Sequence, residues 1–316
     1  MYKIRIAETE NFSESVISKL KEIAMVDVIE TEKTELKKCL EDYDVFWFRL
    51  KFKIEETDFP ENNRCKYILC PVTGIDHIDL DACAKRGIKV LSLKGEKEFL
   101  KKVRATTEHT LALTLALLRQ IPQSVDSVKN HNWQRDLFKG NEIFEKKVGI
   151  LGVGRLGKIT AQYFNALGAE VYGYDVVEFD NSICAKTNSI EELVSMVDIL
   201  SIHVNYEQST HHLINKGIFE KMKPTSFFIN TSRGAVVDSD ALLEALQNKK
   251  IKGAALDVIE NEFDITQNKL IAYASQNNNL IITPHIGGNT WESFSKTELF
   301  MVEKLKERID LNKINN

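Results

Sequence analysis

Short apolar runs alternate with amphipathic stretches along most of the chain, and this alternation limits the fold more than any other feature. In the first third of the chain, the runs expected to form strands are Lys3–Ala7, Val26–Ile29, Val45–Phe48, Tyr67–Val72 and Lys89–Leu93. Helical patterns lie between them. Strands that alternate with helices at this spacing predict βαβ units and therefore a parallel sheet.

The same alternation restarts after a long helical pattern over Thr106–Leu118. Further strands are expected at Lys147–Leu151, Glu170–Tyr174, Ile199–His203, Ser226–Asn230, Gly253–Val258 and Leu280–Thr283. The stretch from about Trp291 to Leu311 is amphipathic and has no strand after it, so it predicts a final helix. Because 316 residues are too many for one small core, we predict an α/β protein with two doubly wound parallel-sheet domains.

A glycine-rich turn joins the predicted strand Lys147–Leu151 to a helical pattern. Its glycines are Gly152, Gly154 and Gly157. Gly152 permits a tight turn, Gly154 lets the backbone approach a pyrophosphate, and Gly157 lets the helix pack against the sheet. Such a motif is weak alone, but the strand before it and the helix after it predict a dinucleotide-binding site of the Rossmann type.

An acidic residue, Asp175, ends the next predicted strand about 20 residues beyond the glycine turn. A carboxylate at this place accepts hydrogen bonds from the adenosine ribose and repels a 2′-phosphate. The residues after it are Val176, Val177 and Glu178, without a cation. The sequence therefore favours NAD over NADP, whereas the alternative interpretation of Asp175 is a solvated acid in a turn.

Three segments late in the chain place charged side chains directly after predicted strands. They carry Arg233, the acids Glu260 and Glu262, and His285 after Pro284. Taken singly, each has a structural alternative: a surface ion pair, a solvated loop charge, or a histidine without a catalytic role. Taken together, they can grip a carboxylate, move a proton near neutral pH and keep an imidazole charged. Those are the groups that reduction of a 2-keto acid by a hydride requires.

Composition excludes several other classes of protein. Lys and Arg number 42 against 46 Asp and Glu, a net charge of −4, which argues against a dedicated nucleic-acid binder. No apolar run approaches the roughly 20 residues that span a bilayer, and the N-terminus lacks an apolar signal core. Five cysteines without a CxxC pair favour reduced thiols over a zinc site. We therefore expect a soluble, cytoplasmic protein without a metal.

The motifs resemble, in order and spacing, those of the D-isomer-specific 2-hydroxyacid dehydrogenases, the family of D-3-phosphoglycerate, glycerate and D-lactate dehydrogenases. The resemblance covers nearly all of the chain. The segments that carry it are Gly74–Asp79, Arg104–Glu108, Gly152–Gly157, Asn230–Gly234, Asp257–Glu262 and Thr283–Gly288.

The resemblance implies a role for each matching residue. Arg233 would bind the substrate, Glu262 would pair with the catalytic histidine, and His285 would transfer the proton. The implied NAD site consists of Gly152, Gly154, Arg155, Leu156, Gly157 and Asp175, with His203, Thr231, Asp257 and Gly288 around the nicotinamide half. Backbone N–H groups of Val72, Thr73 and Gly74 would bind the substrate carboxylate.

The resemblance also implies a domain arrangement. An NAD-binding Rossmann domain, residues 102–288, would be inserted in a flavodoxin-like substrate domain made of residues 1–101 and the returning helix 289–316. The apolar helix Leu111–Leu118 and the region of Trp133 favour a homodimer around the NAD-binding domain. Because the chain ends at Asn316, we expect no C-terminal regulatory domain.

Two residues depart from the family pattern, which usually has proline at both places: Asn205, two residues after His203, and Phe263, directly after Glu262. Neither change removes a reacting group, but both are expected to alter loop shape. Two rival functions stay open. Formate dehydrogenases of this superfamily pair the histidine with glutamine, and Glu262 argues against them. A non-catalytic NAD-binding regulator, similar to the corepressors built on this fold, could keep the same residues.

Arg49 bears on the choice of substrate. The segment Val45–Ile54 carries Arg49, Lys51 and Lys53 at alternating positions, which would share one face of a continuous strand. A solvated strand edge is the alternative explanation. If Arg49 instead reached the substrate, a second cation beside Arg233 would suit a phosphorylated or dicarboxylic acid. With the resemblance to phosphoglycerate dehydrogenases, this favours 3-phosphoglycerate or a similar anionic hydroxy acid.

Overall fold

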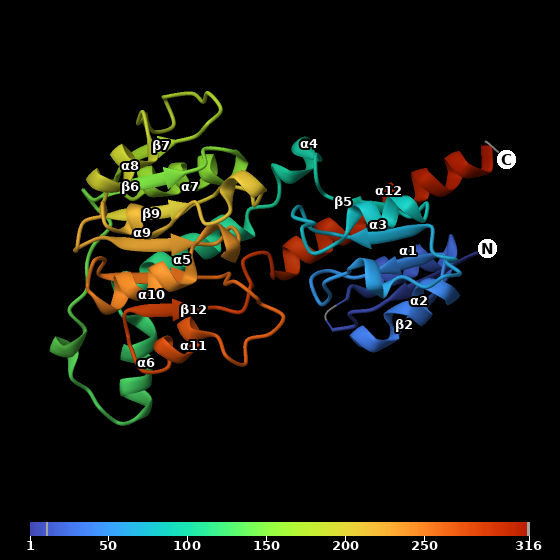
Figure 1. Ribbon diagram of the computed structural model, residues 1–316, viewed down its shortest axis with the longest axis horizontal. Coiled ribbons are helices and arrows are strands. Elements are labelled where there is room, and N and C mark those ends of the chain that lie inside the picture. Colours follow the sequence, from blue (N-terminus) through green and yellow to red (C-terminus); the bar gives the residue numbers. More distant parts are fainter. Residues whose placement is uncertain (11, 315–316) are drawn as a thin grey trace. The chain divides into compact units, whose positions relative to one another are not determined.

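The computed structural model describes residues 1–10 and 12–314, which form two compact units (Figure 1). The first, here the terminal unit, runs from Met1 to Val103 and resumes at Asn289. The second, the central unit, is Arg104–Gly288. Each unit contains its own parallel sheet, so the predicted fold class is confirmed.

The terminal unit has a five-stranded sheet in the order β2-β1-β3-β4-β5 (Figure 1). This is the flavodoxin-like order. Its strands are β1 (Tyr2–Ile6), β2 (Ala24–Val28), β3 (Val45–Trp47), β4 (Tyr67–Cys70) and β5 (Lys89–Ser92). Its helices are α1 (Glu14–Lys21), α2 (Leu36–Asp42), α3 (Leu80–Lys85), α4 (Lys97–Leu100) and α12 (Trp291–Ile314), with 3-10 turns η1 (Lys33–Glu35) and η2 (Glu56–Asp58).

Helices cover both faces of this sheet because alternate strand residues point to opposite sides. In β3, Val45 and Trp47 face a core that includes Leu20 of α1 and Leu305 of α12. Phe46 faces the other core, which contains side chains of α2 and α3. The C-terminal helix α12 therefore packs on one face of the sheet that the first part of the chain forms.

The central unit has a seven-stranded parallel sheet in the order β12-β11-β10-β9-β6-β7-β8 (Figure 1). Its strands are β6 (Lys147–Leu151), β7 (Glu170–Tyr174), β8 (Ala185–Lys186), β9 (Ile199–Ile202), β10 (Phe227–Asn230), β11 (Gly253–Leu256) and β12 (Leu280–Ile282). Its helices are α5 (Ala105–Leu118), α6 (Ile121–Lys129), α7 (Arg155–Ala166), α8 (Ile190–Met196), α9 (Lys216–Phe219), α10 (Ser239–Gln247) and α11 (Lys269–Ala274), with 3-10 turns η3 (Arg135–Phe138), η4 (Gln208–Thr210) and η5 (Gly234–Val236).

Successive strands are added on one side of β6 through β7 and β8, and then on the other side from β9 onward. The reversal creates a crevice at the carboxyl ends of β6 and β9, where open α/β sheets bind ligands. Side chains of α5 and α7 cover one face of the sheet, and those of α8, α9 and α10 cover the other. Among the described residues, every helix is too short or too polar to span a bilayer.

The alternating cations after β3 do not continue that strand. β3 ends at Trp47, so Arg49, Lys51 and Lys53 do not share one strand face. The pairing of β3 with its neighbouring strands stops because the N–H groups of Arg49 and Lys51 donate to the Glu8 carboxylate instead of to a neighbouring strand. The strand expected at Val45–Phe48 is therefore present, but the three cations after it do not line one strand face as the Arg49 hypothesis supposed.

Candidate active site

The glycine turn lies between β6 and α7, at the crevice of the central sheet. Gly152 has φ +93, and a Cβ there would lie 2.8 Å from the backbone of His203. A Cβ on Gly157 would lie 2.0 Å from the carbonyl oxygen of Gly152. Both positions therefore require glycine, as the sequence motif predicts.

The N-terminus of α7 is suited to a phosphate group. Gly154 precedes the helix, and a Cβ built there would meet no heavy atom of the described chain within 4 Å. The N-cap residue Gly154 has no side chain that could cap the helix, and N–H groups in the first turn of a helix point toward the position of a bound anion. The open space and the N–H donors fit the pyrophosphate of NAD.

Asp175 directly follows β7 and also shapes the glycine turn. One carboxylate oxygen accepts a hydrogen bond from the N–H of Val153 at 2.7 Å, and the other accepts one from Val177 at 2.9 Å. Each oxygen keeps a second lone pair that can accept a ribose hydroxyl. Val176 and Val177 are exposed apolar residues, so they offer no charge to a 2′-phosphate.

Two residues that the resemblance places near the nicotinamide follow β9 and β10. His203 is half-buried, and desolvation lowers the pKa of its imidazole to about 4, so this side chain is neutral at physiological pH. Its Nε2 lies 2.8 Å from the hydroxyl of Ser201. The hydroxyl of Thr231 lies 2.8 Å from that of Thr110 in α5. These contacts hold both residues at the carboxyl edge of the sheet.

Asp257, at the end of β11, organises the turn that carries His285. Its Oδ1 accepts hydrogen bonds from Thr283 Oγ1 at 2.6 Å, His109 Nε2 at 3.1 Å and the N–H of Ile286 at 2.9 Å, and its Oδ2 accepts one from the N–H of Gly287 at 2.7 Å. Burial by itself raises the pKa of Asp257, but the hydrogen bonds outweigh it and lower that pKa below its ordinary value. The buried side chain is therefore a carboxylate, and it anchors the turn next to Gly288.

His109, in the first turns of α5, is a site residue that the sequence interpretation missed. Thr283 donates its hydroxyl hydrogen to Asp257, so both partners of His109 Nε2 present acceptor oxygens and this nitrogen carries the hydrogen. The signal available in the sequence was the set of threonines Thr107, Thr110 and Thr114, spaced as on one face of a helix rich in leucine. Their positions indicate that α5 faces polar groups.

His285 and Glu262 form the pair that the motifs predict. The Nδ1 of His285 lies 2.6 Å from Oε2 of Glu262, and both side chains are about one quarter exposed. With Nδ1 donating to the carboxylate, Nε2 is the nitrogen left to exchange a proton with a substrate. His285 has φ +53, a left-handed conformation that is uncommon for a residue other than glycine. Its N–H donates to the carbonyl oxygen of Asp257 at 2.9 Å, which helps to hold this conformation.

Arg233 lies at the same edge of the sheet, one strand away. It follows β10, which is the neighbour of β11. Asn230 shapes the turn: its Oδ1 accepts hydrogen bonds from Ser232, and its Nδ2 donates to the carbonyl oxygen of Arg233 at 3.0 Å. The turn packs closely, since a Cβ on Gly234 would lie 2.0 Å from the backbone of Ile259. Parallel neighbouring strands thus bring the expected catalytic residues to one edge.

The loop of the terminal unit that is expected to bind the substrate follows β4 and contains Val72, Thr73 and Gly74. Val72 is tied down at both ends, because its N–H donates to Cys70 and its carbonyl oxygen accepts from Leu93. Thr73 is exposed. The loop therefore lies at the carboxyl edge of its own sheet, where a parallel sheet places ligands.

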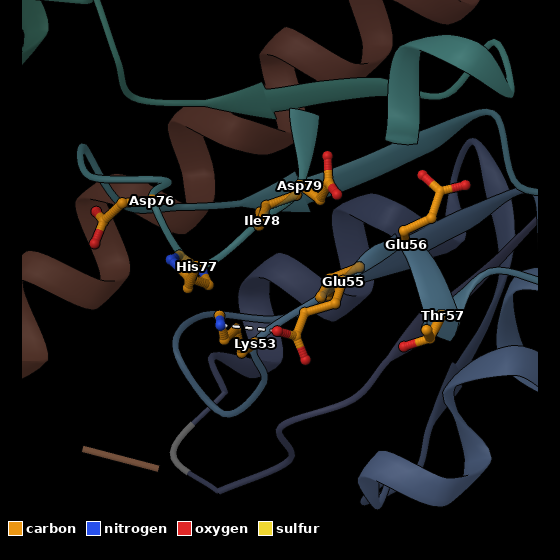
Figure 2. A pocket seen from close by; sticks show the side chains of 9 residues that line it. Lys53, Glu55, Glu56, Thr57, Asp76, His77, Ile78 and Asp79 are labelled. Carbon is orange, nitrogen blue, oxygen red and sulfur yellow. Dashed lines mark hydrogen bonds and ion pairs between the residues drawn. The ribbon is translucent and has the colours of Figure 1, made fainter. Parts of the chain in front are cut away.

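A surface depression in the same unit, with a volume of about 570 Å³, does not suit an anionic acid (Figure 2). Its lining includes Glu55, Glu56, Asp76 and Asp79 but also Lys53. The ammonium of Lys53 lies 2.8 Å from Glu55. Carboxylates thus dominate the lining and would repel a carboxylate or phosphate.

Comparisons with known proteins agree with this geometry. A family model described as "D-isomer specific 2-hydroxyacid dehydrogenase, NAD binding domain" matches residues 111–287. The D-3-phosphoglycerate dehydrogenase of a Synechocystis strain is 30% identical over 96% of this chain and 54% of its own length. The hydroxypyruvate reductase of Thermotoga maritima is 30% identical over 89% of both chains. This chain spans about half the length of the D-3-phosphoglycerate dehydrogenases that it matches.

Solved structures show the same relationship. The D-lactate dehydrogenase of Aquifex aeolicus, described as complexed with NAD and lactic acid, matches with a TM-score of 0.82 and 31% identity over 99% of this chain and 97% of that one. A putative D-3-phosphoglycerate dehydrogenase of Ralstonia solanacearum matches with a TM-score of 0.83 and 26% identity over 99% and 95%. The resemblance seen in the motifs is thereby confirmed, and this chain belongs to the D-isomer-specific 2-hydroxyacid dehydrogenase family, with NAD as its cofactor.

Proposed function

We propose that this protein is an NAD-dependent oxidoreductase that transfers a hydride between the nicotinamide and C2 of a D-2-hydroxy acid or its 2-keto acid. The observation that carries the proposal is the His285–Glu262 pair, held at the sheet edge that also carries Arg233. The glycine turn and Asp175 lie at the same edge of the central sheet, after the carboxyl ends of β6 and β7.

In the proposed reaction, different side chains bind the substrate, transfer the proton and hold the histidine. The guanidinium of Arg233 binds the substrate carboxylate and polarises the neighbouring carbonyl. In the reductive direction, Nε2 of His285 donates its proton to the carbonyl oxygen, and in the oxidative direction it takes the proton back. Glu262 stabilises the imidazolium form through its hydrogen bond to Nδ1. Bound NADH supplies the hydride that C2 accepts, so the products are the hydroxy acid and NAD.

The terminal unit is proposed to bind the substrate and the central unit to bind NAD, with backbone N–H groups of Thr73 and Gly74 directed at the substrate carboxylate. The N–H of Val72, which the resemblance also implied, donates instead to the carbonyl oxygen of Cys70 at 2.8 Å. The relatives do not point to one substrate, because their names include D-3-phosphoglycerate dehydrogenase, hydroxypyruvate reductase and D-lactate dehydrogenase. These substrates differ in whether a second anionic group is present. The proposal that the substrate is 3-phosphoglycerate or a similar anionic acid therefore depends on Arg49.

The test of the reaction class is steady-state oxidation of NADH by the purified protein with a panel of 2-keto acids. The panel contains pyruvate, glyoxylate, hydroxypyruvate, 2-ketoglutarate and 3-phosphohydroxypyruvate. At least one acid is expected to support turnover, faster with NADH than with NADPH because Asp175 repels a 2′-phosphate. Reactions without a keto acid are the control. NADH binding with no turnover of any acid would instead favour a non-catalytic regulator.

We also propose that the protein is a homodimer formed through the central unit. Ile121, Val125 and Val128 lie on one face of α6 and are each 44–49% exposed. Beyond the helix, Trp133 is 86% exposed and Leu137 is 58% exposed. Water contact with so many large apolar groups in one segment is unfavourable, and an interface with a second copy would remove it.

Sedimentation at micromolar concentration is expected to show a dimer for the wild type and a monomer for the double variant Val125→Glu with Trp133→Glu. The two carboxylates would have to be buried without partners at the interface, which is costly. Met25→Glu serves as the matched control, because Met25 is an exposed apolar residue of the terminal unit. A monomeric wild type, or a double variant that stays dimeric, would contradict the proposal.

A further inference from the structure

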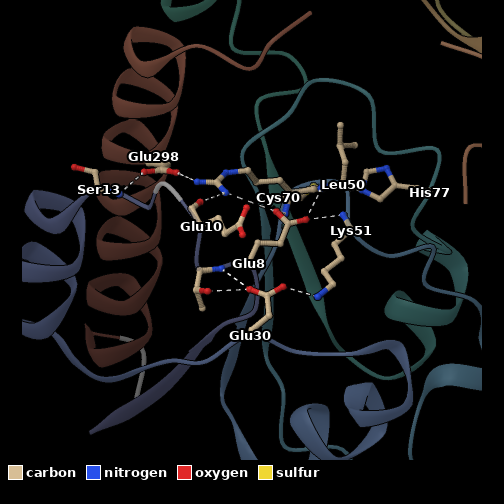
Figure 3. A network of polar contacts seen from close by, with 11 residues as sticks. Glu8, Glu10, Ser13, Glu30, Leu50, Lys51, Cys70, His77 and Glu298 are labelled. Atoms are coloured by element: carbon tan, nitrogen blue, oxygen red, sulfur yellow. Dashed lines mark hydrogen bonds and ion pairs between the residues drawn. The ribbon is translucent and has the colours of Figure 1, made fainter. Parts of the chain in front are cut away.

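Arg49 lies between two carboxylates of the terminal unit, those of Glu8 and Glu298, which are labelled in Figure 3. One end of its guanidinium, Nη2, forms an ion pair with Glu298 of α12, whose side chain is completely buried. The other end, Nη1, lies 3.8 Å from Oε2 of Glu8, just beyond β1. The Arg49 side chain is only 11% exposed, so both ends of the fork already have anionic partners.

Aromatic rings cover the guanidinium as well. Its Cζ lies 4.2 Å from the ring centre of Phe294 and 5.3 Å from that of Phe12. Such cation–π contacts stabilise the side chain in this position. Phe294 belongs to the same helix as Glu298, so one element supplies both a ring and a carboxylate to Arg49.

The backbone around Arg49 is also fully engaged. Glu8 accepts hydrogen bonds from three successive N–H groups, those of Arg49 at 2.9 Å, Leu50 at 3.2 Å and Lys51 at 2.6 Å. The carbonyl oxygen of Arg49 accepts from Cys70 Sγ at 3.0 Å and lies 3.2 Å from Nε2 of His77 (Figure 3). Convergent N–H groups of this kind bind anions. Here the anion is a carboxylate of the chain itself.

The neighbouring cation is occupied in the same way. The ammonium of Lys51 pairs with Glu30 and with Glu32. Its hydrogen bond lowers the pKa of Glu30 to about 2, so this carboxylate is charged. The side chain of Glu8 is 17% exposed and that of Glu298 is completely buried, and this burial raises the pKa of both acids. A second anionic group on a substrate would meet acids here and not an available cation.

From this arrangement we infer that Glu8 and Glu298 are specificity-determining residues that hold Arg49 away from the substrate, and that the preferred substrates are 2-keto acids without a second anionic group. The inference rests on the proposed function and narrows it. It is opposite to the substrate preference that the position of Arg49 in the sequence suggested. The physical reason is that the Arg49 charge is already neutralised inside the terminal unit.

The test compares hydroxypyruvate with 3-phosphohydroxypyruvate, which differ only in the phosphate. The wild type is expected to show a kcat/KM at least about tenfold higher for hydroxypyruvate. Glu298→Gln or Glu8→Gln, each of which removes one competing charge, is expected to reduce that preference about tenfold or more, through a lower KM for the phosphorylated acid. Glu303→Gln is the matched control, because Glu303 lies on the same helix with an exposed side chain; it should leave the preference unchanged.

Two variants are used because loss of a buried acid can destabilise α12, and thermal unfolding identifies any variant that does not fold. A wild type that prefers the phosphorylated acid would overturn the inference, and so would an unchanged preference in a folded Glu8 or Glu298 variant. Calorimetric titration of the NADH complex with 3-phosphoglycerate separates this inference from the proposed function. If no acid is turned over, the proposed function fails. Binding of 3-phosphoglycerate to the variants but not to the wild type would still support the inference. Tight binding of 3-phosphoglycerate to the wild type would overturn the inference.

Discussion

Replacing Arg233 with alanine is expected to lower kcat/KM for the best 2-keto acid by roughly a thousandfold. The guanidinium is proposed to bind the substrate carboxylate in the ground state and to stabilise the charge that develops on the carbonyl oxygen in the transition state. Its loss should therefore raise KM and also lower kcat. Steady-state kinetics with NADH at saturation measure both quantities.

Arg233→Lys distinguishes charge from geometry in this prediction. Lysine keeps the charge but lacks the planar fork that binds a carboxylate through two parallel hydrogen bonds, so an intermediate loss is expected. NADH affinity, measured by fluorescence titration, should stay close to that of the wild type because Arg233 is assigned to the substrate. Near-normal turnover by Arg233→Ala would remove this residue from the proposed mechanism.

His285→Asn is expected to lower kcat by about 10²–10⁴-fold, the usual contribution of a positioned general acid. Asparagine is the suitable replacement because His285 has φ +53, and asparagine tolerates this left-handed conformation better than most residues. The variant should therefore keep the turn anchored by Asp257 while losing the group that transfers the proton.

Glu262→Gln gives the complementary measurement. It keeps a hydrogen-bond acceptor for Nδ1 of His285 but removes the negative charge 2.6 Å from it, so a smaller loss of reductive kcat is expected than for His285→Asn. Circular dichroism and NADH titration establish that each variant folds and binds cofactor. If folded His285→Asn reduces the keto acid at the wild-type rate, another group must transfer the proton.

Much of the site could be predicted because its residues lie directly after strands. The apolar runs that form β6, β7, β10, β11 and β12 are local patterns, and parallel strands bring their carboxyl ends to one edge. The glycine turn was equally predictable. Backbone contacts require Gly152 and Gly157, and such a requirement is visible in the residue types themselves.

Sequence reasoning failed where a polar side chain is matched by a residue far along the chain. His109 and Asp257 are 148 positions apart, and no periodicity connects them. The same holds for the segment after β3, since the alternation of Arg49, Lys51 and Lys53 gave no sign that Glu8 would accept the N–H groups of Arg49 and Lys51. A side chain that competes for backbone N–H groups ends a strand without changing the local pattern.

The α/β class, the nucleotide turn and the identity of the residues at the strand ends could all be predicted from the amino-acid order, because each depends on short-range spacing or on the conformational freedom of glycine. The contacts that those residues make depend on how the chain folds. Arg49 and Glu298 are 249 positions apart and share a buried ion pair; only the packing of α12 in the terminal unit brings them together. An arginine at a strand end has the same appearance in a sequence whether a substrate or a carboxylate of the chain neutralises it. The difference is electrostatic, and it depends on which distant groups the folded chain places within a few ångströms.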